Sequence, residues 1–142
     1  MDYIVENTIF SRLNRLIVKI KKSMAKELKP YDVTLEQWSL LTRLWKQDSV
    51  SQTELAIRTN KDLPTVTRSL NKLIKKGLIE KRDNPEDSRA SVICLTKAGR
   101  ELEVPLDSIA KEVELKITNS MELSELEIFK KLMKNISNEF DN

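Results

Sequence analysis

Residues 62–99 read DLPTVTRSLNKLIKKGLIEKRDNPEDSRASVICLTKAG, a stretch that combines a helix, a helix stop and a hairpin. Residues 62–76 carry apolar side chains at helical spacing, with basic side chains between them. Gly77 is the stop, because glycine readily takes the left-handed conformation found just after many helices. The turn formers DNPEDS then lie between two short runs of strand formers. The stretch therefore predicts a basic helix followed directly by a β-hairpin.

The segment before this stretch predicts a second helix that pairs with the basic one. Ser51 and Glu54 form a capping box, which opens a short helix over about 52–58. A turn at 59–61 leads to Asp62, the predicted N-cap of the basic helix. Two short helices joined by so tight a turn predict a helix-turn-helix.

The basic helix has one apolar side and one polar side at 100° per residue. Leu63, Val66, Leu70 and Leu73 are predicted to be buried. The opposite side and the edges carry the candidate DNA-contacting residues Thr65, Thr67, Arg68, Asn71, Lys72 and Lys75. Arg68 could bind guanine, and Asn71 could bind adenine or phosphate. The two threonines could contact phosphates or thymine methyl groups, and the two lysines would mainly contact phosphate. A merely solvated amphipathic helix is the alternative, which the paired helix and the hairpin disfavour.

The hairpin is predicted from strands over 78–82 and 90–95, joined by the turn 83–88. Arg89 lies beside the acidic tip. Asp87, two residues before it, could hold the guanidinium in a fixed geometry for insertion into a minor groove. The alternative is a surface ion pair that contributes less than about 1 kcal/mol. The spacing alone leaves both possibilities open.

Both ends of the chain predict long amphipathic helices. Apolar residues recur at spacings of three and four over 2–29, and Pro30 ends that helix. Residues 97–142 are also predicted to be helical, with a weak point at Pro105 and a final helix opened by a capping box at Ser124. We expect these stripes to pack together and against a second subunit. Packing within a monomer is the alternative.

Two tryptophans lie on the helix predicted from the capping box of Thr34 and Gln37 through Lys46. Trp38 and Trp45 are one helical face apart and could line a small-molecule cavity, so they are candidate ligand-binding residues. The alternative is that both belong to the core.

Composition narrows the class of protein. The chain has 142 residues, 33% of them charged, which fits one water-soluble domain. Its apolar runs are too short to cross a membrane and its N-terminus lacks a secretion signal, so we expect a cytoplasmic protein. There is no histidine and a single cysteine, Cys94, which we expect to be a small packed residue. This composition predicts no metal site, no cofactor and no enzyme.

The distribution of charge points to a polyanionic partner. Residues 58–89 contain nine Lys or Arg and five Asp or Glu, a net charge of +4. Residues 101–142 contain five and ten, a net charge of −5. The middle of the chain is therefore expected to meet nucleic acid and the C-terminal part is not. A solvated charged face would account for either block alone.

Several short motifs together resemble the MarR family of winged helix-turn-helix regulators. The D-x-R…LT-x-x-G pattern of that family is matched by Asp87-Ser-Arg89 and Leu95-Thr96-Lys-Ala-Gly99. The resemblance extends upstream through Leu73-Ile-Lys-Lys-Gly77-Leu-Ile, Val66-Thr-Arg68, Gln52-Thr-Glu-Leu55-Ala56 and Thr34-Leu-Glu-Gln37.

The resemblance implies a mostly α-helical protein with a small β-hairpin wing and a dimerisation layer. Residues 1–30 and 100–142 would form that layer in a homodimer, and 31–99 the winged helix-turn-helix. Such proteins bind pseudo-palindromic double-stranded DNA operators, usually as repressors, and are often released by small aromatic ligands. The recognition helix would be 62–76 and the wing 82–91.

Carried over by position, the resemblance makes Arg89 the wing arginine, oriented by Asp87. The chain departs from the family pattern at Pro64, where many members have a polar residue, and at Ala90 and Ser91, which make the wing less basic. Two other functions stay open: a winged-helix module that binds proteins, and a small-molecule-binding protein without DNA binding.

Overall fold

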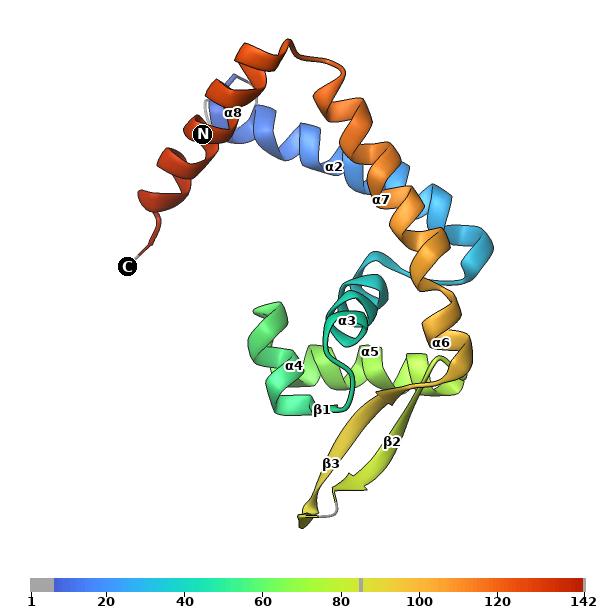
Figure 1. Cartoon of the computed structure of the whole chain (residues 1–142). Helices are drawn as coiled ribbons and strands as arrows, with labels where there is room; N and C mark the ends of the chain where they lie inside the picture. Colours follow the sequence, from blue (N-terminus) through green and yellow to red (C-terminus); the bar gives the residue numbers. More distant parts are fainter. Residues whose placement is uncertain (1–6, 85, 142) are drawn as a thin grey trace.

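The computed structural model describes residues 7–84 and 86–141, apart from the side chains of residues 88–90. The chain forms an upper arm of long helices above a lower body of short helices and a small sheet (Figure 1). The elements in chain order are α2 (Ile9–Leu28), η1 (Lys29–Tyr31), α3 (Leu35–Lys46), β1 (Val50–Ser51), α4 (Gln52–Thr59), α5 (Leu63–Lys75), β2 (Ile79–Asn84), β3 (Asp87–Leu95), α6 (Lys97–Glu101), α7 (Glu103–Thr118) and α8 (Leu123–Asn138). The predicted mostly α-helical fold with a hairpin wing is confirmed.

The hydrophobic core surrounds α3 in the lower body. Leu40, Leu41 and Leu44 of this helix are buried, and α3 packs against α2, α4, α5 and β3. Leu28 at the end of α2 and Leu106 in α7 are fully buried in the same core. The roots of the arm and the lower body therefore share one core.

The sheet has three antiparallel strands in the order β1-β3-β2. β3 is central: its Ile93 lies opposite both Val50 of β1 and Lys81 of β2. The two strands of the hairpin extend further than predicted, so the turn between them is shorter than 83–88. β1 was not predicted, because two residues are too few to give a strand pattern.

The ends of the helices confirm some predictions and correct others. α2 begins at Ile9, where Thr8 is the N-cap and accepts from the Ser11 backbone N–H, so the helical prediction was wrong for residues 7 and 8. Residues 2–6 of that prediction lie outside the described residues. The helix ends at Leu28, before Pro30, as predicted. Pro105 lies in the first turn of α7, and the helical chain breaks just before it, at Leu102.

The three predicted capping boxes have different outcomes. The box of Thr34 and Gln37 is complete, with both hydrogen bonds at 3.2 Å. Ser51 accepts from the Glu54 backbone N–H at 3.1 Å, but the Glu54 carboxylate is 2.5 Å from Arg58 and pairs with that side chain. The box predicted at Ser124 was wrong: α8 begins two residues earlier, with a box formed by Glu122 and Glu125.

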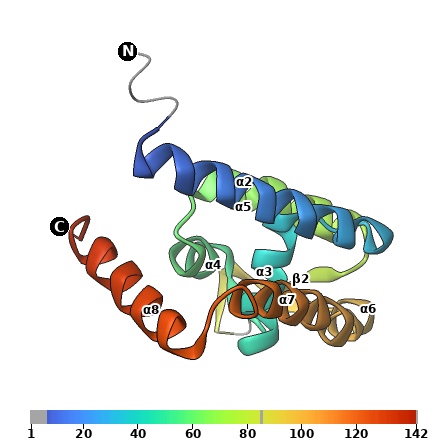
Figure 2. The same cartoon turned by 90° about the horizontal axis from the view of Figure 1, so that it is seen from above.

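The terminal helices α2 and α8 leave much apolar surface exposed to solvent. α8 extends clear of the other helices when the molecule is seen from above (Figure 2). All of α8 lies within the described part of the chain, and none of its residues is buried. The exposed apolar residues of α2 and α8 include Ile9, Phe10, Leu13, Leu16, Ile17, Leu123, Ile128, Leu132, Met133 and Ile136.

Among the described residues, no helix is long and apolar enough to cross a bilayer. In the same part of the chain, no group of three or more Cys, Asp or Glu side chains is arranged to hold a metal ion.

Candidate nucleic-acid interface

The helix-turn-helix consists of α4 and α5, which pack against each other. Asn60 ends α4 in the left-handed conformation, with φ 54°, and this turns the chain toward α5. Asp62 is the N-cap of α5, and Pro64 fits the first turn because its missing N–H would have no helical partner there. Gly77, with φ 73°, ends the helix as predicted.

One side of α5 is buried and the other faces solvent. Val66, Leu70 and Leu73 lie in the core as predicted. The prediction for Leu63 was wrong, because this side chain is 45% exposed. It lies in the first turn, where the helix extends beyond the core. The predicted DNA-contacting residues that are exposed are Arg68, Asn71, Lys72 and Lys75, and Thr65 and Thr67 are half-buried.

Asp62, Thr65 and Arg68 form a chain of hydrogen bonds at the start of α5. The Thr65 hydroxyl donates to the Asp62 carboxylate at 2.6 Å and accepts from Arg68 at 3.4 Å. The Thr65 backbone N–H donates to the other Asp62 oxygen at 3.3 Å. The hydrogen bond from the Thr65 side chain is the main reason that the pKa of Asp62 lies below its ordinary value. Sequence reasoning identified Asp62 only as a cap and missed that it helps to hold Arg68.

Lys76 has a different role from the lysines before it. Its ammonium group donates to the Gln37 side chain at 2.8 Å and to the Asp32 backbone carbonyl, and lies 3.7 Å from the Asp32 carboxylate. These contacts tie the C-terminal end of α5 to the N-terminal end of α3. Lys72 and Lys75 are exposed instead, so they stay the predicted phosphate-contacting lysines of α5.

The wing is the hairpin of β2 and β3. Arg82 on β2 pairs with Glu80 on the same strand, and the hydrogen bond to Glu80 is the main reason that the pKa of Arg82 is raised. Asp87 is exposed at the start of β3. The backbone of Arg89 lies in β3, but its side chain lies outside the described residues, so its orientation by Asp87 stays a prediction.

The root of the wing is fastened by Asp48. Its carboxylate accepts from the Leu95 backbone N–H at 2.9 Å and lies 3.6 Å from Arg100. Cys94 is buried beside it, with its sulfur 3.3 Å from the Ser49 hydroxyl, in agreement with the expectation of a packed residue. The base of the wing is thus tied to the segment just before β1.

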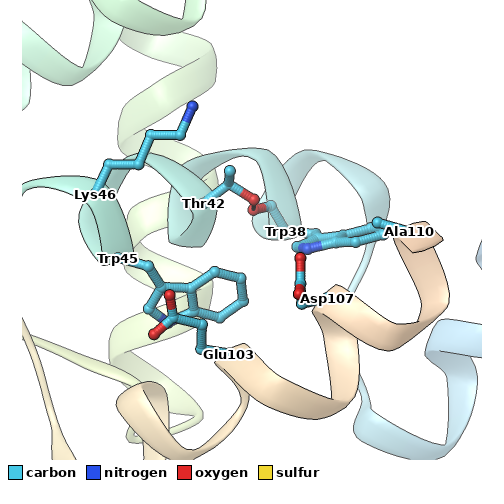
Figure 3. A pocket seen from close by; sticks show the side chains of 7 residues that line it. All are labelled: Trp38, Thr42, Trp45, Lys46, Glu103, Asp107 and Ala110. Atoms are coloured by element: carbon cyan, nitrogen blue, oxygen red, sulfur yellow. Dashed lines mark hydrogen bonds between the residues drawn. The ribbon is translucent and has the colours of Figure 1, made fainter.

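A cavity of about 190 Å³ lies between α3 and α7 (Figure 3). Trp38 is buried in the core as well as lining the cavity, and the Trp45 indole donates to the Gly99 carbonyl at 3.0 Å. The Asp107 carboxylate lies near the Trp38 indole and the Glu103 carboxylate near Trp45 (Figure 3), and Asp107 is 3.0 Å from Lys111. The residues that line the cavity are Trp38, Thr42, Trp45, Lys46, Glu103, Asp107 and Ala110. Trp38 thus belongs to the core and both tryptophans line a cavity, while the binding of a ligand there stays a prediction.

Known proteins resemble this chain in sequence and in structure. The model of the MarR family matches residues 33–91, which include the helix-turn-helix and most of the wing. YdgJ of Bacillus subtilis, an uncharacterized HTH-type transcriptional regulator, is 38% identical over 82 residues, which are 58% of this chain and 48% of YdgJ. The chain therefore spans about half the length of YdgJ in this match.

Two longer matches extend the comparison over nearly the whole chain. SarZ of Staphylococcus aureus (strain MRSA252), an HTH-type transcriptional regulator, is 30% identical over 127 residues, 87% of this chain and 83% of SarZ. The crystal structure of the S. aureus MepR–DNA complex matches with a TM-score of 0.88 and 26% identity, covering 95% of this chain and 100% of that one. The motifs, the fold and these relatives agree, and the chain belongs to the MarR family.

Proposed function

We propose that this protein is a transcriptional regulator that binds double-stranded DNA in a sequence-specific way. The observation that carries the proposal is the exposed polar side of α5, with Arg68, Asn71, Lys72 and Lys75 beside the wing. A B-DNA major groove accepts one α-helix, whose N-terminal residues reach the base edges. The likeness of the fold to that of MepR in a DNA complex supports the proposal that α5 enters the major groove.

The proposed active form is a homodimer. Uncovered apolar surface on α2 and α8 costs free energy in water, and a second copy of the same surfaces would bury it. Residues 1–30 and 100–142 then form the dimerisation layer around the two DNA-binding regions of 31–99. The two recognition helices would read successive major grooves, about 34 Å apart, of a pseudo-palindromic operator. We infer repression as the mode of action, because a dimer seated on an operator blocks access to it.

Selection of genomic DNA fragments by the purified protein tests this function directly. We expect nanomolar binding to fragments that share an inverted repeat, with a strong dependence on salt. Sedimentation of the complex should give two chains per operator. Binding that is equally weak for every fragment would contradict sequence-specific recognition.

We also propose that a small aromatic ligand occupies the cavity between α3 and α7 and weakens operator binding. The indoles of Trp38 and Trp45 offer stacking surface, and the carboxylates of Glu103 and Asp107 line the same space. Lys46, the basic residue of the lining, points away from the indole rings (Figure 3). Since Asp107 is already paired with Lys111, the Glu103 carboxylate is the charge that favours a neutral or cationic aromatic ligand over an aromatic carboxylate.

Intrinsic fluorescence tests the ligand proposal, since the chain contains just two tryptophans and both line the cavity. Benzyltrimethylammonium, benzyl alcohol and benzoate are suitable probes that differ mainly in charge. We expect quenching and a rise in melting temperature with the first two, reduced for the cation in Glu103→Gln. No response to any of the three would remove this cavity from the mechanism while leaving DNA binding untouched.

A further inference from the structure

The first turn of α5 exposes apolar side chains at the end of the helix that is proposed to enter the major groove. Leu63 and Pro64 are its first two residues; Leu63 is 45% exposed and Pro64 is also exposed. Ile57 of α4 is 74% exposed and lines the same shallow hollow as Leu63, together with Lys61. Both apolar side chains lie outside the core, so stability of the fold does not account for them.

The polar groups of this turn are already engaged with one another. Both oxygens of the Asp62 carboxylate accept hydrogen bonds from Thr65, and the Thr65 hydroxyl also accepts from Arg68. Pro64 has no backbone N–H to donate. Asp62 and Thr65 are therefore already engaged in capping α5, and the side chains of Leu63 and Pro64 have no polar group with which to read a base. The surface that remains for a base is the methyl and methylene surface of Leu63 and Pro64.

The major groove offers one apolar group on its base edges, the C5 methyl of thymine. We propose that Leu63 and Pro64 read thymine methyl groups and so select T·A pairs at the outer contact of each half-site. The inference rests on the DNA binding proposed above. Lys61, beside these residues, is placed to contact the neighbouring phosphate.

The position of the selected thymine follows from helix geometry. Leu63 and Arg68 are five residues apart, which corresponds to about 7.5 Å along the helix axis. Because neighbouring base pairs are about 3.4 Å apart along the duplex, the thymine should belong to a different base pair from the one that Arg68 contacts. Apolar readout and hydrogen-bonded readout thus occupy adjacent parts of one half-site.

Replacement of single thymines by deoxyuridine tests this inference, because it removes the methyl group and keeps every hydrogen-bonding group. Dissociation constants are measured by fluorescence anisotropy for each substituted operator, with the wild type and with Leu63→Ala. We expect one or two positions in each half-site where deoxyuridine weakens wild-type binding about fourfold, the effect of losing one buried methyl-sized group. In Leu63→Ala the replacement at the thymine read by Leu63 should have no further effect, whereas a thymine read by Pro64 should stay sensitive.

Val104→Ala is the matched control, since Val104 is an apolar residue of α7 that is 75% exposed. Its deoxyuridine profile should equal that of the wild type. A wild type insensitive to every replacement, or a Leu63→Ala variant as sensitive as the wild type, would overturn the inference. Tight binding of the unmodified operator would in that case leave the proposed function standing. Failure of the wild type to bind any unmodified fragment would instead overturn the proposed function, and the inference with it.

Discussion

At the scale of single residues, Arg68 is the side chain whose surroundings matter most for reading a base. It extends from α5, but its guanidinium contacts Thr65, which in turn contacts Asp62. A side chain held in this way loses less conformational entropy on binding than a free arginine. The acidic cap Asp62 therefore helps to orient Arg68 toward DNA, although the negative charge of Asp62 repels phosphate.

The pKa of Asp62 gives a pH prediction for this contact. Since the folded-state pKa lies below the ordinary value of 3.8, ionised Asp62 stabilises the fold at pH values above the pKa of the unfolded chain. That stabilisation is lost as the pH falls through the folded pKa. We therefore expect Asp62→Asn to lower the melting temperature at pH 7, and the difference from the wild type to shrink below about pH 4. A difference that stays constant down to pH 2.5 would contradict this explanation.

At the scale of elements, α5 is held at both ends, and its lysines divide between structure and binding. Lys76 joins α5 to α3, whereas Lys72 faces solvent. We expect Lys76→Met to lower the free energy of unfolding by about 1–2 kcal/mol and to leave the salt dependence of DNA binding unchanged. Lys72→Met should leave the melting temperature unchanged and reduce the magnitude of the salt slope by about one.

These two variants have the same substitution on the same helix, so each is the control for the other. Chemical denaturation gives the stability, and titrations at several salt concentrations give the slope. Equal effects of the two variants on the slope would mean that Lys76 also contacts phosphate.

The junction between β3 and α6 depends on close packing at Gly99. A Cβ atom at this position would lie 2.0 Å from the backbone carbonyl oxygen of Leu78, which cannot move aside as a flexible side chain could. We expect Gly99→Ala to cost about 3 kcal/mol of stability, the upper end of the usual cost of overpacking. Gly77→Ala is the matched control: there is open space around it, and its cost of about 1 kcal/mol comes from the positive φ alone. Denaturant unfolding measures the stability of both variants. Equal losses of unfolding free energy in Gly99→Ala and Gly77→Ala would contradict this ranking.

At the scale of the whole molecule, the terminal helices α2 and α8 of a single chain leave many apolar side chains exposed to solvent. Leu132 of α8 is 50% exposed and lies on the apolar side of that helix. If the proposed dimer forms through this side of α8, we expect Leu132→Glu to be a monomer in analytical ultracentrifugation and to bind the operator at least tenfold more weakly, while circular dichroism stays unchanged. Lys131→Glu, which adds negative charge on the opposite side of α8, should remain dimeric. A dimer that survives Leu132→Glu would move the interface elsewhere.

The order of the elements could be predicted from the sequence because each has a local signal, such as the Thr34 capping box or Gly77. The exposure of Leu63 could not, because helical spacing does not show where the core ends. β1 escaped prediction because its pairing with β3 depends on residues more than forty positions away. The exposure of the polar side of α5 was predicted correctly, while its contact with DNA stays a prediction. The contacts of Lys76 could not be, because α3 and α5 are brought together only by folding.

The helix α3 is bonded to the DNA-reading part of the molecule at both of its ends. Near the N-terminus of α3, Gln37 accepts a hydrogen bond from Lys76 at the end of α5. Near its C-terminus, the Trp45 indole donates to the carbonyl of Gly99 in α6. Such bracing makes bending within the reading unit costly, so a disturbance at the cavity should tilt the unit as a whole. We therefore expect an effector to alter the distance between the two reading units in the dimer rather than the shape of either. Operators with one base pair inserted at their centre would then respond differently to ligand from the natural spacing.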